Sequence, residues 1–219
     1  MALGEFAVGK AESKAVAGKK AEKPQEPPPA RDPAGALRSQ SSQNLTLESV
    51  AWKFDGLLDG LDDIENVRTK GFGEFAKFVK AKLSATKSDD RVKKYNLTMA
   101  SFDHGDLSIR QARLDIARIL AQYLIDERRS HCRAHYSTCQ KRDEVCVALA
   151  SFFPGGRADE SNKAAAQDVV AAAILVPDSA KVGEMGDDES LTHMRAVATE
   201  YEIPFGAVAL RRKILQQAR

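Results

Sequence analysis

The 219-residue chain has no long apolar run and few cysteines. Its longest apolar segment, 169–176, is far shorter than the roughly 20 residues that a membrane-spanning helix needs. The three cysteines are an odd number, which does not indicate a disulfide framework and fits a reducing compartment. The first residues lack the apolar core of a secretory signal and contain too many acidic residues for a mitochondrial presequence. We therefore expect a cytoplasmic protein without a membrane partner.

Several motifs of catalysis and nucleotide binding are also missing. No GxxxxGK[ST] or GxGxxG segment is present, so no phosphate-binding loop can be assigned. No GxSxG segment offers a nucleophile elbow. There is no HExxH, the pattern in which two histidines bind zinc and a glutamate activates water. The sequence thus favours a protein that is not an enzyme.

Charge is nearly balanced, with 33 basic and 31 acidic residues. Residues 1–44 contain seven basic and five acidic residues, which account for the whole excess of +2. The remainder carries no net charge and has no long-range field to attract a polyanion. Any binding of nucleic acid would need a local basic patch.

Composition divides the chain at about residue 44. Residues 1–44 are rich in Ala, Lys and Pro and contain too little apolar surface to offset the entropy of ordering, so we predict a disordered tail. Residues 45–219 are long enough for one domain with its own core. We predict a single, mainly helical domain there.

Apolar residues recur every three to four positions, which predicts amphipathic helices. The predicted helices cover 47–61, 72–83, 108–153, 161–175, 191–201 and 204–215. Ser108, with Gln111 three residues later, resembles a capping box, and the long segment that follows should break near Ser130 or Ser137. The helix over 161–175 ends before Pro177 and is almost wholly apolar from residue 169, so we expect it to be the central core helix.

One segment indicates β structure. Residues 95–102 (YNLTMASF) are β-prone, and the 103–106 segment (DHGD) has turn chemistry. The sequence therefore predicts a mainly α fold, or an α+β fold with one short β-hairpin near 95–109. Two carboxylates and an imidazole in 103–106 could serve acid–base chemistry, but a plain turn explains them.

His131, Cys132, His135, Cys139 and Cys146 form the densest group of potential metal ligands. On one straight helix the Cα atoms of Cys132 and Cys139 would be about 10.5 Å apart, too far for two thiolates on one zinc ion or for a disulfide. The favoured interpretation is a buried stripe of small apolar residues on one helix face. A small zinc-binding module on Cys132, His135, Cys139 and Cys146 remains an alternative.

The last two predicted helices, over 189–217, have a helix-turn-helix outline. Arg211, Arg212 and Lys213 lie near the end of the second helix, where cations are favoured by the helix dipole. In DNA readers the first residues of that helix reach the bases, and here they are Pro204, Phe205 and Gly206. We favour a helical hairpin and keep a DNA-binding transcriptional regulator as an alternative.

Several of these apolar patterns together resemble ImmA/IrrE-type metallopeptidases over about 113–215. The segment 168–177 (DVVAAAILVP), followed by the helical pair through 203–204 and 207–212, is similar to the C-terminal half of that family. The segment 113–126 (RLDIARILAQYLID) resembles the family's active-site helix, usually RFTLAHELGHYLLH. The resemblance implies that this helix is the place where the zinc-binding motif would stand.

At the positions that match the family's His, Glu and His, this chain has Arg118, Ile119 and Gln122. A guanidinium cannot ligate zinc, Ile has no proton to exchange, and a Gln amide is a poor zinc donor. The resemblance therefore implies a pseudo-peptidase without zinc.

In the family a third ligand is an acid on the next helix. Its match falls near Ala164, with Glu160 and Asp168 as the nearest carboxylates. Active relatives resemble one another in controlling repressors, on mobile elements and in stress responses, by cleaving them. The resemblance thus implies a non-catalytic regulator that binds a protein partner, with a repressor as the candidate.

Overall fold

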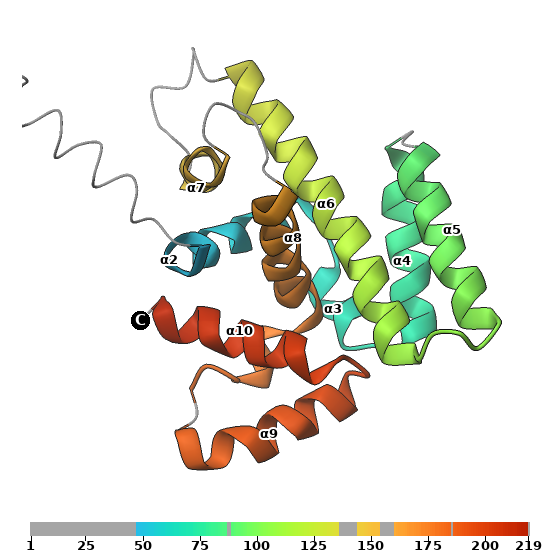
Figure 1. The fold of residues 1–219 in the computed structure, drawn as a ribbon, viewed down its shortest axis with the longest axis vertical. Coiled ribbons are helices and arrows are strands. Elements are labelled where there is room, and N and C mark those ends of the chain that lie inside the picture. The colour runs from blue at the N-terminus through green and yellow to red at the C-terminus, as the bar shows by residue number, and fades with distance from the viewer. Residues whose placement is uncertain (1–46, 87–88, 136–143, 154–159, 185, 219) are drawn as a thin grey trace, which may run out of the picture.

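The computed structural model describes residues 47–86, 89–135, 144–153, 160–184 and 186–218. Within these ranges all regular structure is helical and there is no strand (Figure 1). The elements are α2 (Leu47–Ala51), the 3₁₀ helix η1 (Trp52–Gly60), α3 (Ile64–Arg68), α4 (Phe72–Ala85), α5 (Asp89–Asp103), α6 (Ile109–His135), α7 (Glu144–Phe152), α8 (Glu160–Leu175), the 3₁₀ helix η3 (Asp178–Ala180), α9 (Asp187–Glu200) and α10 (Phe205–Gln217). The predicted mainly α domain is confirmed. No described helix is both long enough and apolar enough to cross a membrane.

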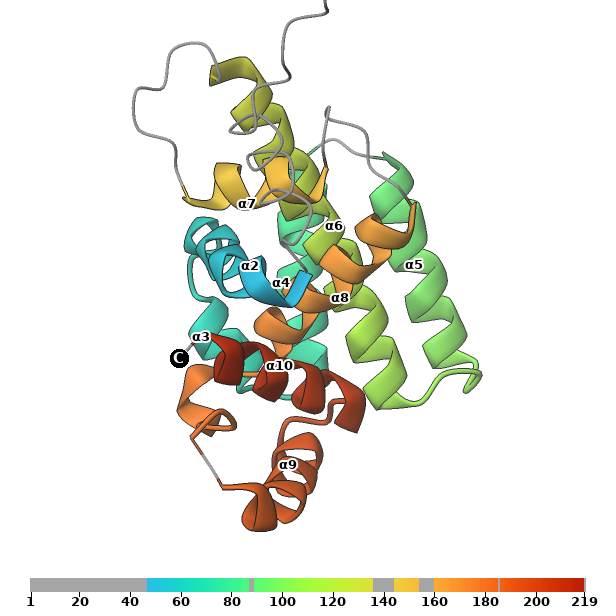
Figure 2. The same ribbon diagram turned by 60° about the vertical axis from the view of Figure 1, so that its left-hand side comes forward.

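Helix α8 is the centre of the fold. Its second half is apolar on every side, and every residue from 169 to 176 is at most 3% exposed. Helices α6, α10, α2 and α3 surround it (Figures 1 and 2). The alanines at 171–173 have small side chains, which let neighbouring backbones approach closely. The prediction that this segment forms the central core helix is confirmed.

The first predicted helix is split in two. Its apolar face is correct, because Val50, Phe54, Leu57 and Leu61 are all at most 5% exposed. Only residues 47–51 are α-helical, however, and a nine-residue 3₁₀ helix follows. Such long 3₁₀ runs are uncommon in proteins. Spacing of three to four residues suits both helix types, so the pattern could not distinguish them.

The predicted β-hairpin near 95–109 is wrong. Residues 95–102 belong to α5, where the buried Tyr95 donates a hydrogen bond from its hydroxyl to the Ala76 carbonyl on α4 (2.9 Å). Packing against α4 and α6 outweighs the local β-propensity, which depends strongly on context.

The predicted turn that follows is confirmed. Gly105 has φ +83°, and the amide of Asp106 donates to the Ser101 carbonyl (2.9 Å), as in a Schellman cap.

Helix α6 begins where the capping residue predicts. The Ser108 hydroxyl accepts a hydrogen bond from the Gln111 amide (3.2 Å). The helix continues through Ser130 to His135, so it does not break at Ser130. Ser137 lies outside the described residues. Helix α7 is a separate element that packs against η1, α2 and α6.

Two buried arginines connect α3, α6 and α8. Arg68 is 1% exposed and donates to the Ala173 carbonyl of α8 (2.9 Å). Arg113 of α6 is fully buried, donates to the carbonyls of Arg68 (2.7 Å) and Lys70 (2.9 Å), and lies over the Phe75 ring at 5.0 Å. Burial lowers the pKa of both arginines. These contacts position α6 against α8.

Candidate functional site

The three positions that match the peptidase motif lie on α6 beside α8. The Nε of Arg118 donates to Oδ1 of Asp168 on α8 (2.7 Å), and its NH1 lies 3.3 Å from Oδ1 of Asp115. Ile119 is in the core at 7% exposure, and Gln122 is half-buried. A guanidinium between two carboxylates therefore occupies the place that the resemblance assigns to a zinc-binding histidine.

Further hydrogen bonds extend this polar contact, which we call the Arg118 cluster (Gln111, Asp115, Arg118, Gln167 and Asp168). The side-chain amide of Gln111 donates to Oδ1 of Asp115 (2.9 Å), and the side-chain amide of Gln167 donates to the main-chain carbonyl of Arg118 (2.9 Å). The bonds of Arg118 with Asp168 and of Gln167 with the Arg118 carbonyl join α6 to α8, whereas Gln111 and Asp115 bond within α6. The cluster thus brings together two carboxylates, one guanidinium and two side-chain amides.

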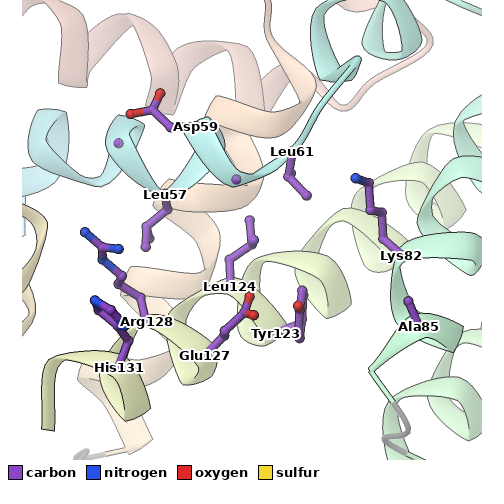
Figure 3. Close-up of a pocket in the computed structure, with 12 residues that line it drawn as sticks. Leu57, Asp59, Leu61, Lys82, Ala85, Tyr123, Leu124, Glu127, Arg128 and His131 are labelled. Carbon is purple, nitrogen blue, oxygen red and sulfur yellow. The ribbon is translucent and has the colours of Figure 1, made fainter. Parts of the chain in front are cut away.

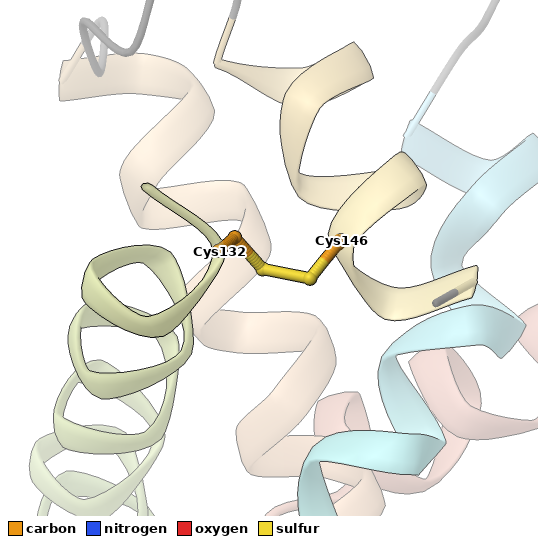
Figure 4. Close-up of a disulfide and its surroundings, with 2 residues drawn as sticks. All are labelled: Cys132 and Cys146. Atoms are coloured by element: carbon orange, nitrogen blue, oxygen red, sulfur yellow. A yellow bond between two sulfur atoms is a disulfide. The ribbon is translucent and has the colours of Figure 1, made fainter. Parts of the chain in front are cut away.

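The candidate zinc ligands are arranged differently from the prediction. Cys132 on α6 and Cys146 on α7 form a disulfide, with their Cα atoms 5.7 Å apart (Figure 4). The expectation that the cysteines are thiols on one helical stripe is wrong for this pair. The two residues lie on separate helices, and α7 packs beside the end of α6, so their Cα atoms come within the range for a disulfide.

This pairing leaves only part of the predicted zinc set. The side chain of His135 and the whole of Cys139 lie outside the described residues. Oxidised sulfur is not the thiolate that zinc requires. No group of three or more potential ligands that could hold a metal occurs within the described ranges.

The three candidate nucleic-acid residues on α10 differ in exposure. Arg211 is 3% exposed and donates to Oδ1 of Asp55 (2.7 Å) and Oδ1 of Asp178 (3.0 Å). It joins α10 to η1 and η3, and it is not available to a phosphate. Arg212 is half-buried and Lys213 is exposed. The basic patch on this helix is therefore smaller than the sequence indicates.

A pocket that the sequence did not predict lies between η1, α4 and α6, with a cavity volume of about 560 Å³ (Figure 3). Leu57, Leu61 and Leu124 form its apolar part. The polar residues lining it are Asp59, Lys82, Tyr123, Glu127, Arg128 and His131. A volume of this size lies in the range of ligand sites. No local motif predicts it, because its walls come from three segments far apart in sequence.

Of the ionisable side chains that line the pocket, Tyr123 has the largest pKa shift. Burial raises the pKa of Tyr123 to about 12, with further contributions from a hydrogen bond to Glu127 and from the Glu127 charge. The guanidinium of Arg91 opposes these effects from 5.6 Å over the ring. The phenol is therefore neutral at physiological pH.

Comparison of the chain with protein-family models, curated proteins and solved structures gave no match. The functional argument therefore depends on the residues and contacts of this chain. Two places are candidates for function: the Arg118 cluster, which the resemblance singles out, and the pocket beside the disulfide.

Proposed function

We propose that this chain is a non-catalytic, cytoplasmic regulatory protein that binds a protein partner, a transcriptional repressor being the candidate, as an antirepressor would. The observation that supports it is the ion pair of Arg118 with Asp168. It lies on the helix that resembles the ImmA/IrrE active site, and it joins that helix to the one bearing the nearest carboxylate. A guanidinium in that position repels a divalent cation and cannot ligate it.

The packing of α6 on α8 is the second support for the proposal. Helices α6 and α8 form the largest helix contact of the described fold, with fully buried Ile116 and Leu120 on α6 and Val170 and Ile174 on α8. A scaffold of that kind can present a binding surface without performing chemistry. A packed helix pair without the family's reactive residues is compatible with a binding role.

The test uses the full-length chain and a repressor recovered with it from the native host, with both proteins then purified separately. The proposal expects a stoichiometric complex, an intact repressor after incubation, and weaker binding of the repressor to its operator. Cleavage of the repressor, one zinc ion per chain under reducing conditions, or no complex between the pure proteins would overturn it.

A second candidate function is a DNA-binding regulator that uses α9 and α10. It is favoured by exposed Lys213 and half-buried Arg212 on one helix of the pair. Duplex binding would weaken as salt rises, because phosphate contacts release counterions. Fluorescence anisotropy in a salt series tests it, and Lys213→Ala should reduce the salt slope by about 1 if that residue contacts a phosphate.

A further inference from the structure

The Cys132–Cys146 disulfide is the covalent bond that fastens α7 to α6 (Figure 4). Both cysteines are half-buried, so each residue is partly exposed to solvent. In the cytoplasm, where we place this chain, glutathione and thioredoxin keep thiols reduced, and disulfides there are usually transient or redox-sensing. A bond at this position is therefore exposed to reversible exchange.

Besides the disulfide, α7 is held by an apolar face and by a hydrogen bond from the Asn162 side-chain amide of α8 to the Phe152 carbonyl (3.5 Å). Val145, Ala148, Leu149 and Phe152 are at most 8% exposed, and the Phe152 ring lies 5.4 Å from the Phe54 ring of η1. The helix has only nine residues, and isolated helices of this length are marginal in water. Its order therefore depends on the core contact and the disulfide together.

Helix α7 also supports the wall of the pocket. A Cβ at Gly56 would lie 2.7 Å from Cγ2 of Val145, so η1 and α7 are in close contact there. Gly56 lines the pocket on the η1 side, and Arg128 and His131 line it on the α6 side, just before Cys132. Thus α7 is fastened to one wall of the pocket and packs on the opposite wall.

We propose that the Cys132–Cys146 disulfide is a redox clamp, and that its reduction by a thiol of the glutathione class releases α7 from η1 and opens the pocket between η1 and α6. A glutathione thiolate attacks one sulfur, the S–S bond breaks, and the other cysteine leaves as a thiolate. A second glutathione thiolate then attacks the mixed disulfide and releases the first cysteine. Two electrons pass to the protein, its two cysteines each take up a proton, and glutathione disulfide forms.

The experiment equilibrates the oxidised full-length chain in glutathione buffers from oxidising to strongly reducing. Thiol titration should count one thiol per chain at the oxidised end and three at the reduced end, and reoxidation should restore the first value. Hydrogen exchange of 144–152 should become about 100-fold faster on reduction, since the bond closes a loop with a sequence separation of 14. Exchange in 52–60 should also rise, and fluorescence of Trp52, the single tryptophan, should report the change at the start of η1.

Two variants complete the test. Cys132→Ser combined with Cys146→Ser should show fast exchange of 144–152 in every buffer, with exchange of 72–103 unchanged as the control for folding. Cys139→Ser should respond to glutathione as the natural chain does. Unchanged exchange of α7 after reduction, a bond that resists reduction in all buffers, loss of the response in Cys139→Ser, or a stoichiometric zinc ion in the reduced chain would each overturn the proposal.

Discussion

The Nε of Arg118 lies 2.7 Å from Oδ1 of Asp168, and this ion pair joins the middle of α6 to α8. Its members are 37% and 43% exposed, so the pair lies at the surface of the helix contact. Exposed ion pairs contribute little to stability. Its main consequence is chemical, because it places a permanent positive charge beside Asp168, one of the two carboxylates nearest to the third-ligand position that the peptidase resemblance implies.

Replacing that charge should convert the position into a metal site. In Arg118→His combined with Gln122→His, two imidazoles four residues apart would share one helix face near Asp168, which is the ligand set of catalytic zinc sites. We expect this variant to bind one zinc ion, as measured by titration with a chromophoric chelator as competitor. Adding Asp168→Ala should weaken the binding. Failure of the double variant to bind zinc would contradict the placement of these three residues around one site.

Arg211 should matter for stability. Arg211→Met leaves Asp55 and Asp178 without their buried partner and should lower the free energy of unfolding by about 1–3 kcal/mol, as expected for hydrogen bonds to charged groups. The control is Lys213→Met on the same helix, an exposed position where the change should stay within about 0.5 kcal/mol. Urea denaturation measures both. Equal effects of the two substitutions would mean that Arg211 is not held inside the protein.

Gly183 lies against α10, where there is no room for a side chain. A Cβ at Gly183 would lie 2.7 Å from Cβ of Leu215, closer than real Cβ atoms approach. Gly183→Ala should therefore destabilise the protein by about 1–3 kcal/mol through overpacking. At Gly186 a Cβ would meet nothing within 4 Å, so Gly186→Ala is the matched control. Thermal unfolding of the two variants distinguishes them, and a neutral Gly183→Ala would refute the close contact.

Tyr123 should make stability fall at alkaline pH. Burial raises the pKa of Tyr123 to about 12, whereas the pKa of a tyrosine in the unfolded chain is near its ordinary value of 10.0. Between these values the unfolded chain loses the proton and the folded chain keeps it. The contribution of Tyr123 to the free energy of unfolding is therefore fully present below pH 10 and is lost as the pH rises toward 12. Absorbance titration of phenolate should show a step near pH 12 that is missing in Tyr123→Phe; a normal step for Tyr123 would count against the pocket geometry.

Local sequence patterns determined much of the helical fold. The hydroxyl of Ser108 can satisfy an amide at a helix start, and Gly105 can adopt a positive φ at a helix end, whatever the rest of the chain does. The apolar run at 169–176 predicted a central helix because no face of it suits water. The same patterns misassigned residues 95–102, where side chains of high β-propensity lie on α5 because α4 and α6 cover one face of it.

Only the tertiary structure determined which residues come together in the candidate sites and which of them are exposed. Arg211 and Lys213 are two cations two residues apart, and which of them faces solvent depends on where α10 meets η1 and η3. The disulfide depends on α7 returning beside the end of α6, which the cysteine spacing alone does not specify. The pocket needs η1, α4 and α6 together. What one segment can do by itself was readable from the sequence, whereas contacts between distant segments depend on the packing of the whole core.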